Sequence, residues 1–140
     1  MKNHNFRIVV ITSLLIAVSS CSFTKDKQIA ESAVVQFHNQ YSSAQFHEIY
    51  NQADKGFRKS ADEAKFVEYA EAVRRKLGTV RQASQTSWHV NSTTDGTVVT
   101  LSYDTEFSEG KGTEQFAFHI VGDKALLYGY NVNSPLLVTR

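Results

Sequence analysis

Four polar side chains in the C-terminal half could meet on one surface and do chemistry: His89, Ser102, Asp104 and His119. If consecutive strands pair as hairpins, His89, Ser102 and His119 lie in one row across three adjacent strands. Asp104 is two residues from Ser102 along its strand. A hydroxyl activated by His119 and oriented by Asp104 is the arrangement of a nucleophilic site.

A metal or catalytic role for this row faces a geometric objection. Strands lie about 4.8 Å apart, so the backbones of His89 and His119 would be roughly 9–10 Å apart, whereas zinc needs both nitrogens within about 2.1 Å. An open sheet face also supplies neither an oxyanion hole nor exclusion of water. We therefore expect no metal and no cofactor, and we interpret the four residues as a polar sheet face or a partner surface.

A second candidate site is an apolar pocket centred on Tyr103, whose hydroxyl could donate to a developing oxyanion. Its expected lining is aromatic: Trp88, Tyr103, Phe107, Phe116 and Phe118. Such walls suit a small apolar ligand. Packing in the core is the alternative role for all five rings.

Acid–base chemistry in this pocket would also need an acid or base that points inward. The inward strand positions offer Ser84, Thr86 and Thr105, but the expected registers give no inward carboxylate. A helix could supply the base through His38, Glu48 or Asp54, although each is expected to face solvent. We therefore predict a binding domain without catalysis, with an acid–base enzyme as the alternative.

The only cysteine, Cys21, follows an apolar run and two small residues. Lys2 and Arg7 precede the run at residues 8–18, which is the layout of a signal peptide. At about 1.5 Å per residue this run is roughly 16 Å long, too short for a bilayer core that needs around 20 residues. The segment Val18-Ser19-Ser20-Cys21 resembles the bacterial lipobox, which implies that the Cys21 thiol receives a diacylglycerol and becomes the mature N-terminus.

This interpretation divides the chain into three parts. Residues 1–20 are the expected lipoprotein signal peptide, residues 21–27 the lipidated N-terminus with a short tether, and residues 28–140 a single domain. Membrane lipid attached at Cys21 would hold the protein in the cell envelope. If the host has two membranes, Ser22 after the cysteine resembles an address for the periplasmic side of the outer membrane.

Charge excludes one class of partner. Two of the 15 basic side chains precede Cys21, so 13 basic side chains accompany 14 acidic ones after it. Nucleic-acid binders carry a basic face, and the only dense basic cluster is Arg74-Arg75-Lys76, which opposes the negative end of a helix. We expect no nucleic acid as a partner.

Periodicity predicts helices in the first half of the chain. Apolar residues recur at helical spacing over residues 27–41, and Ser42-Ser43-Ala44-Gln45 is typical of a capping box that begins a second, short helix. Residues 53–59 break the pattern, and we expect a few extended residues around Phe57. A second capping box at 60–63 then begins a helix that Gly78 ends.

After Gly78 the period becomes two, which predicts four strands at residues 80–91, 97–107, 113–121 and 125–133. The expected registers pair Trp88 with Tyr103 and Tyr103 with Phe118. One face of this meander is then apolar, with Trp88, Val90, Leu101, Tyr103, Phe107, Phe116, Phe118 and Ile120. The predicted fold is α+β: three N-terminal helices packed on one face of a curved four-stranded antiparallel meander.

This order of elements carries a resemblance to a known superfamily. Its motifs here are Phe37-x3-Tyr41, Phe46-x2-Ile49-Tyr50, Phe57, Lys76-Leu77-Gly78 and Gly129-Tyr130-Asn131-Val132. The pattern resembles the cystatin-like cone of ketosteroid isomerase, scytalone dehydratase and nuclear transport factor two, and in particular its small uncharacterised bacterial lipoproteins. The resemblance implies a conical pocket that binds a ligand, or a sheet that dimerises.

Three functions are consistent with these patterns. The first is a tethered domain that binds a small apolar ligand or an envelope protein. The second is the enzyme alternative, which the resemblance implies would be isomerase- or dehydratase-like and would use the cone pocket. The third is a structural envelope protein that forms a homodimer through the outer sheet face.

Overall fold

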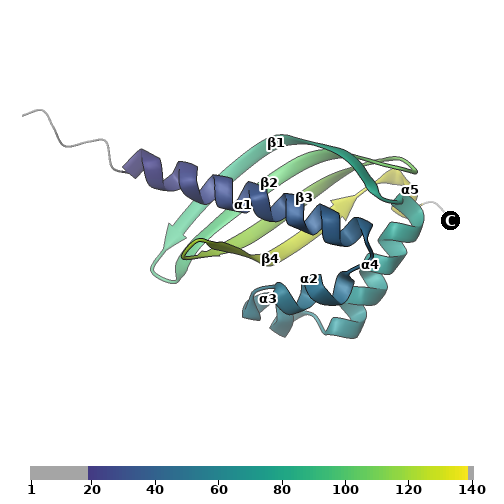
Figure 1. Ribbon diagram of the computed structural model, residues 1–140, viewed down its shortest axis with the longest axis horizontal. Helices are drawn as coiled ribbons and strands as arrows, with labels where there is room; N and C mark the ends of the chain where they lie inside the picture. Colours follow the sequence, from purple (N-terminus) through teal and green to yellow (C-terminus); the bar gives the residue numbers. More distant parts are fainter. Residues whose placement is uncertain (1–18, 139–140) are drawn as a thin grey trace, which may run out of the picture.

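The computed structural model describes residues 19–138 (Figure 1). Its elements follow in the order α1 (Ser19–Ser42), α2 (Phe46–Gln52), α3 (Lys55–Ser60), α4 (Glu63–Leu77), β1 (Val80–Thr93), β2 (Gly96–Phe107), β3 (Lys111–Val121), β4 (Lys124–Asn133) and α5 (Pro135–Val138). The four strands form one antiparallel sheet in sequence order. The predicted α+β class, with helices followed by a four-stranded meander, is confirmed.

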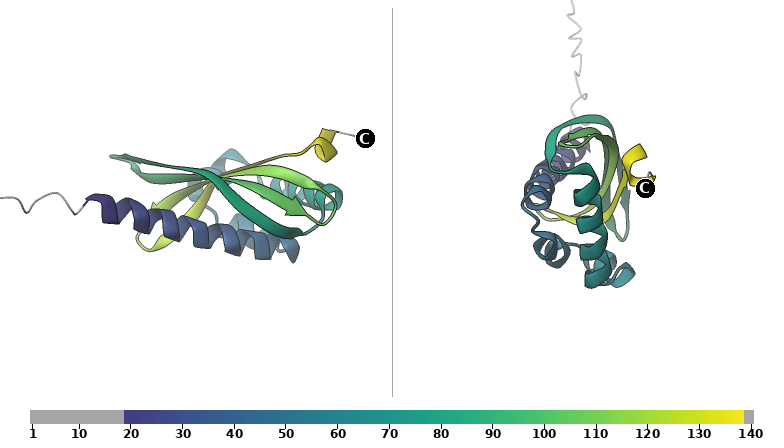
Figure 2. Two further views of the ribbon diagram at one scale, coloured as in Figure 1. Left: turned by 90° about the horizontal axis from the view of Figure 1, so that it is seen from above. Right: turned by 90° about the vertical axis from the view of Figure 1, so that its right-hand side faces the viewer.

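Helix α1 lies along one face of the sheet, and α5 stands on the other side (Figure 2). The stripe of α1 that faces the strands is buried and consists of Ala30, Val34, Phe37 and Tyr41. These residues recur every three or four positions, as one face of a helix requires. Helix α1 begins at Ser19, well before the predicted residue 27, so the predicted tether at residues 21–27 is helical. Among residues 19–138, no helix is long and apolar enough to cross a membrane.

The start of α2 differs from the prediction. No side chain caps its first turn, and Ala44 takes a left-handed conformation with φ of 58°. The predicted capping box at residues 42–45 is therefore wrong. The Ser42 hydroxyl instead accepts a hydrogen bond from the amide of Val80 at 3.2 Å, which fixes the end of α1 to the start of β1.

Helix α3 occupies the segment where the sequence pattern predicted a break. Asp54 caps it by accepting the amide of Gly56 at 2.6 Å. Helix α4 is capped by Asp62, whose carboxylate accepts the amides of residues 64 and 65, rather than by Ser60. Four helices, not three, therefore precede the sheet.

The strand registers also differ from the prediction. Trp88 lies opposite Leu101 rather than Tyr103, because the turn is formed by residues 94–95 instead of Asp95-Gly96, so that Thr93 pairs with Gly96. An irregularity between Gln85 and Ser87 then places Ser84, which was expected to point inward, on the outer face opposite Asp104. Tyr103 lies opposite Glu114 rather than Phe118, a shift of four residues between β2 and β3. An even shift keeps every side chain of β3 on its predicted face, since side chains alternate with a period of two.

Aromatic rings fill the space between α1 and the sheet. Phe37 of α1 packs against Phe116 and Tyr130 with ring centroids 5.1 and 4.6 Å away, and the latter two are 5.0 Å apart. A second cluster joins Tyr50, Phe57 and Phe66 of α2, α3 and α4. The core is thus continuous from the sheet through α1 to the outer helices.

Candidate functional site

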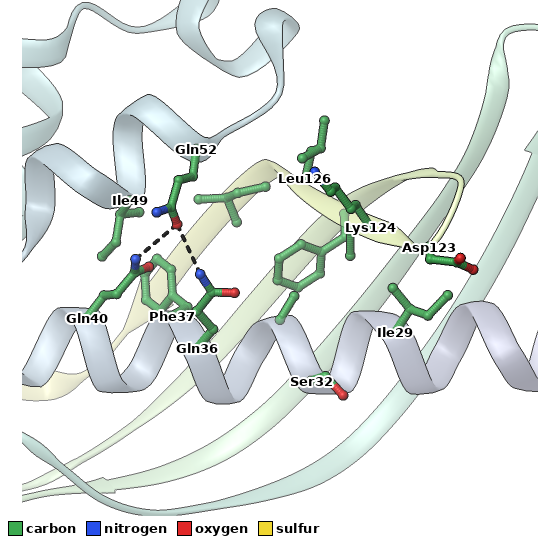
Figure 3. A pocket seen from close by; sticks show the side chains of 14 residues that line it. Ile29, Ser32, Gln36, Phe37, Gln40, Ile49, Gln52, Asp123, Lys124 and Leu126 are labelled. Atoms are coloured by element: carbon green, nitrogen blue, oxygen red, sulfur yellow. Dashed lines mark hydrogen bonds between the residues drawn. The ribbon is translucent and has the colours of Figure 1, made fainter.

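A groove of about 620 Å³ lies between α1, α2 and the β3–β4 hairpin (Figure 3). Ligand sites typically have volumes of about 300–1,000 Å³ and mostly apolar walls. The apolar walls of this groove include Ile29, Ala33, Phe37, Ile49, Phe118 and Leu127. The groove therefore has the size and lining of a small-molecule site.

One end of the groove carries three amide side chains. Gln52 of α2 accepts a hydrogen bond through Oε1 from Gln36 Nε2 and another from Gln40 Nε2 of α1, each at 3.0 Å (Figure 3). The two donors are four residues apart, so they lie on the same face of α1. This arrangement leaves the Gln52 amide nitrogen and the side-chain carbonyls of Gln36 and Gln40 available to a ligand.

The other end of the groove lies at the β3–β4 turn, beside Asp123 and Lys124. Lys25 of α1 forms an ion pair with Asp123 at 2.8 Å. The hydrogen bond from Lys25 and its positive charge lower the pKa of Asp123. Both side chains are exposed, so this pair adds little stability, but it places charge at only one end of the groove.

Helices α2 and α3 are held beside β4 by Asp54. Its amide donates to the carbonyl of Leu127 at 2.9 Å, and its carboxylate Oδ2 lies 3.1 Å from His119 Nδ1. Burial alone would raise the pKa of Asp54, but hydrogen bonds from the Gly56 amide and His119, with the charges of His119 and Lys55, bring this pKa below its usual value. The predicted solvent-facing position of Asp54 is wrong, since it is 6% exposed.

The aromatic residues predicted to line a pocket are mostly packed in the core. Tyr103, Phe107 and Phe116 are buried, and burial raises the pKa of Tyr103. Phe118 is the one predicted pocket residue that lines the groove. Trp88 lies on edge strand β1, is 50% exposed and has the ammonium of Lys27 5.7 Å from its ring centroid.

The most prominent polar cluster of the interior surrounds Glu114, which the sequence interpretation missed. Glu114 is 2% exposed. Its Oε2 accepts hydrogen bonds from His38 Nε2 at 2.8 Å and from the Thr105 hydroxyl at 2.6 Å, and its Oε1 accepts one from the Tyr130 hydroxyl at 2.8 Å. Burial, followed by the charge of Glu114 and this hydrogen bond, raises the pKa of Tyr130 well above its usual value.

The sequence held a signal for this carboxylate. Phe116, Phe118 and Ile120 were assigned to the inner face, and Glu114 shares their alternation. The statement that no inward carboxylate exists is therefore wrong, as is the solvent-facing position expected for His38, whose side chain is 11% exposed. All three donors come from elements that enclose the core, so the cluster joins α1 to three strands.

The four predicted outer-face residues do not form a common row. His89 lies opposite Thr100, Ser102 opposite Gln115, and His119 opposite Val98. His119 is directed to Asp54, while the side chain of Asp104 makes no hydrogen bond or ion pair with the described residues. Within residues 19–138, no three His, Cys, Asp or Glu side chains are grouped as metal ligands would be.

The fold and the groove define a class: a small α+β domain with one long helix across an open four-stranded sheet and an apolar groove along one sheet edge. Residues 33–130 match a protein family described as "Protein of unknown function (DUF4019)", and the chain belongs to this family. The matched segment includes the Glu114 cluster and most of the groove. In a comparison with curated proteins, none matched this chain.

Proposed function

We propose that this protein is a lipoprotein of the cell envelope whose domain binds a small, neutral, mainly apolar ligand in the groove, without catalysis. The observation that carries the binding function is the groove itself, with apolar walls and one end made of amide side chains. An apolar body would contact Ile29, Ala33 and Phe118, and a hydrogen-bonding group would reach the glutamines. The lack of a charged side chain at the glutamine end favours a neutral ligand.

Anchoring through Cys21 is the second part of this proposal. It is supported by the lipobox-like sequence and by the exposed position of Cys21 near the first described residue of α1. The resemblance to cystatin-like lipoproteins supports the same function, and the position on the periplasmic side of an outer membrane is proposed with it. The other class of occupant is a partner protein of the envelope, which dye binding and protein capture by the groove variants distinguish from a small ligand.

An acid–base enzyme is supported less well. Glu114 and His38 are the inward groups that such an enzyme would need, but neither lines the groove. The carboxylate oxygens of Glu114 already accept three hydrogen bonds from the protein. Their arrangement is that of a structural polar cluster.

Filling the groove tests the binding site. Nile red, a neutral apolar dye, is expected to bind the full chain with a saturable rise in fluorescence. Ala33→Trp places a large ring in the groove and is expected to weaken dye binding about tenfold or more, since the cavity would lose much of its volume. The matched control is Val35→Trp, because Val35 is 60% exposed on another face of α1.

Equal dye binding by the two tryptophan variants would contradict the groove as the site. Failure of the wild-type chain to bind Nile red at all would contradict an apolar small-molecule ligand, and capture of an envelope protein that Ala33→Trp abolishes would then assign the groove to a partner. Thermal unfolding of both variants checks that each is folded.

Replacing Cys21 by serine tests the anchor. Each buried methylene contributes about 0.8 kcal/mol, and two acyl chains give stable attachment. Cys21→Ser is therefore expected to leave the precursor uncleaved or to move the protein to the soluble fraction, while wild type stays with the membranes. Fractionation with mass spectrometry of the N-terminus measures both; processing and fractionation identical to wild type would contradict lipidation.

A further inference from the structure

A second hollow, of about 800 Å³, is lined by residues of the sheet and of α5. Helix α5 lies on the side of the sheet away from α1 (Figure 2). The walls of the hollow come from all four strands and from α5. They include Ser84, Asp104, Thr113, Asn133, Pro135 and Val138. The Ser134 hydroxyl fixes the start of α5 by accepting the amide of Leu136 and donating to the carbonyl of Lys111 at 2.7 Å.

Polar side chains cross this face in two complete rows. The register places Ser84, Asp104, Thr113 and Asn133 opposite one another from β1 to β4, and places Ser87, Ser102, Gln115 and Asn131 in the neighbouring row. Among the described residues, none of these eight side chains makes a hydrogen bond with another protein group. Their donors and acceptors are therefore open to a ligand.

The chemistry of the two rows selects one class of ligand. Protein surfaces usually mix positive and negative charges, but seven of these eight side chains are uncharged hydroxyls and amides. The hollow also contains one cation and one further carboxylate, Lys111 and Glu106, whose charges offset each other in an ion pair at 2.9 Å. A polycation would meet Asp104 as the single carboxylate of both rows.

Neutral hydroxyl-rich molecules match such a surface. Each sugar hydroxyl both donates and accepts, as do the serine, threonine, asparagine and glutamine side chains here. Strand spacing repeats these groups about every 4.8 Å across the sheet, and Asp104 can accept two hydroxyls at once. Pro135 and Val138 provide an apolar edge for the C–H face of a sugar ring.

We propose that the outer-face hollow is a binding site for a neutral oligosaccharide, with Asp104 as its central acceptor. This site is separate from the groove and does not depend on the function proposed for it. Its ligand would lie across the four strands.

The experiment is an NMR titration of the full chain with tetra-N-acetylchitotetraose. Saturable amide shifts are expected in the two polar rows. Asp104→Ala is expected to weaken binding about tenfold, which is about 1.4 kcal/mol, because the variant lacks the charged acceptor of the site. Thr113→Val, which keeps the shape of the side chain, is expected to weaken it by a smaller factor.

Asp95→Ala is the matched control, because Asp95 is an exposed carboxylate in the β1–β2 turn, outside both rows. Equal effects of the two aspartate variants, or no saturable shift in wild type, would overturn the proposal. Saturable shifts of the same rows with spermidine but not with the sugar would also overturn it and identify a cation site. A dimer formed through this face, detected by sedimentation, would also overturn the proposal.

Discussion

Replacing Glu114 by leucine is expected to lower the free energy of unfolding by about 3–5 kcal/mol, the range found when one partner of a buried charged cluster is removed. Leucine would remove the acceptor of three hydrogen bonds and leave His38, Thr105 and Tyr130 without their partner. Each orphaned buried donor costs about 1–3 kcal/mol. Urea denaturation at neutral pH measures the change.

The control for this prediction is Glu106→Leu, on the same sheet. Glu106 faces solvent and pairs with Lys111, so its replacement is expected to change the free energy of unfolding by about 0.5 kcal/mol or less. A Glu114→Leu protein as stable as Glu106→Leu would contradict a structural role for the cluster. A double-mutant cycle with Tyr130→Phe then isolates the coupling between Glu114 and Tyr130.

Gly78→Ala is expected to cost about 3 kcal/mol, from backbone strain of about 1–3 kcal/mol together with overpacking of about 1–3 kcal/mol. Gly78 ends α4 with φ of 80° and ψ of −155°, a conformation that essentially only glycine adopts. An added Cβ would lie 1.8 Å from the Ser108 hydroxyl oxygen. That hydroxyl accepts the amide of Thr79 at 3.1 Å, so it cannot move away freely.

Gly122→Ala is the matched control for the steric part. Gly122 also has a positive φ, 61°, but an added Cβ would meet nothing within 4 Å. Its replacement is therefore expected to cost only about 1 kcal/mol of backbone strain. Thermal or urea unfolding compares the two, and adding Ser108→Gly to Gly78→Ala is expected to recover the steric share. Equal losses at the two glycines would contradict the close approach to Ser108.

The fold class could be predicted from the sequence, because the period of the apolar residues and the turn glycines are local features of the chain. The change of period at Gly78 marks the end of α4, and glycines at residues 96 and 122 mark two of the hairpin turns. Residues 53–60 were harder to predict, because a six-residue helix has too few apolar positions to show a period. Helix α3 is capped locally by Asp54, but the packing of Phe57 on Phe66 of α4 is a tertiary contact that the pattern does not show.

The candidate sites were less predictable than the fold. The register error between β2 and β3 was four residues, so the inner face stayed correct while the expected row of His89, Ser102 and His119 did not form. The groove could not be predicted from the sequence, because it depends on tertiary contacts such as those of Asp54, whose amide donates to Leu127 of β4 and whose carboxylate contacts His119 of β3. Lipidation of Cys21 and the boundaries of the mature chain stay predictions.

The uninterrupted course of α1 has a mechanical consequence. Twenty-four residues form one helix about 36 Å long, and Cys21 lies in its first turn. With an acyl anchor at Cys21, the domain would be joined to the membrane by a rigid, continuous helix rather than by a flexible linker. The β3–β4 turn lies toward the same end of the molecule as the start of α1 (Figure 1). Lys25 of α1 forms an ion pair with Asp123 of this turn. The end of the groove beside Asp123 and Lys124 would then lie next to the bilayer, where an apolar molecule could pass between lipid and protein with little exposure to water.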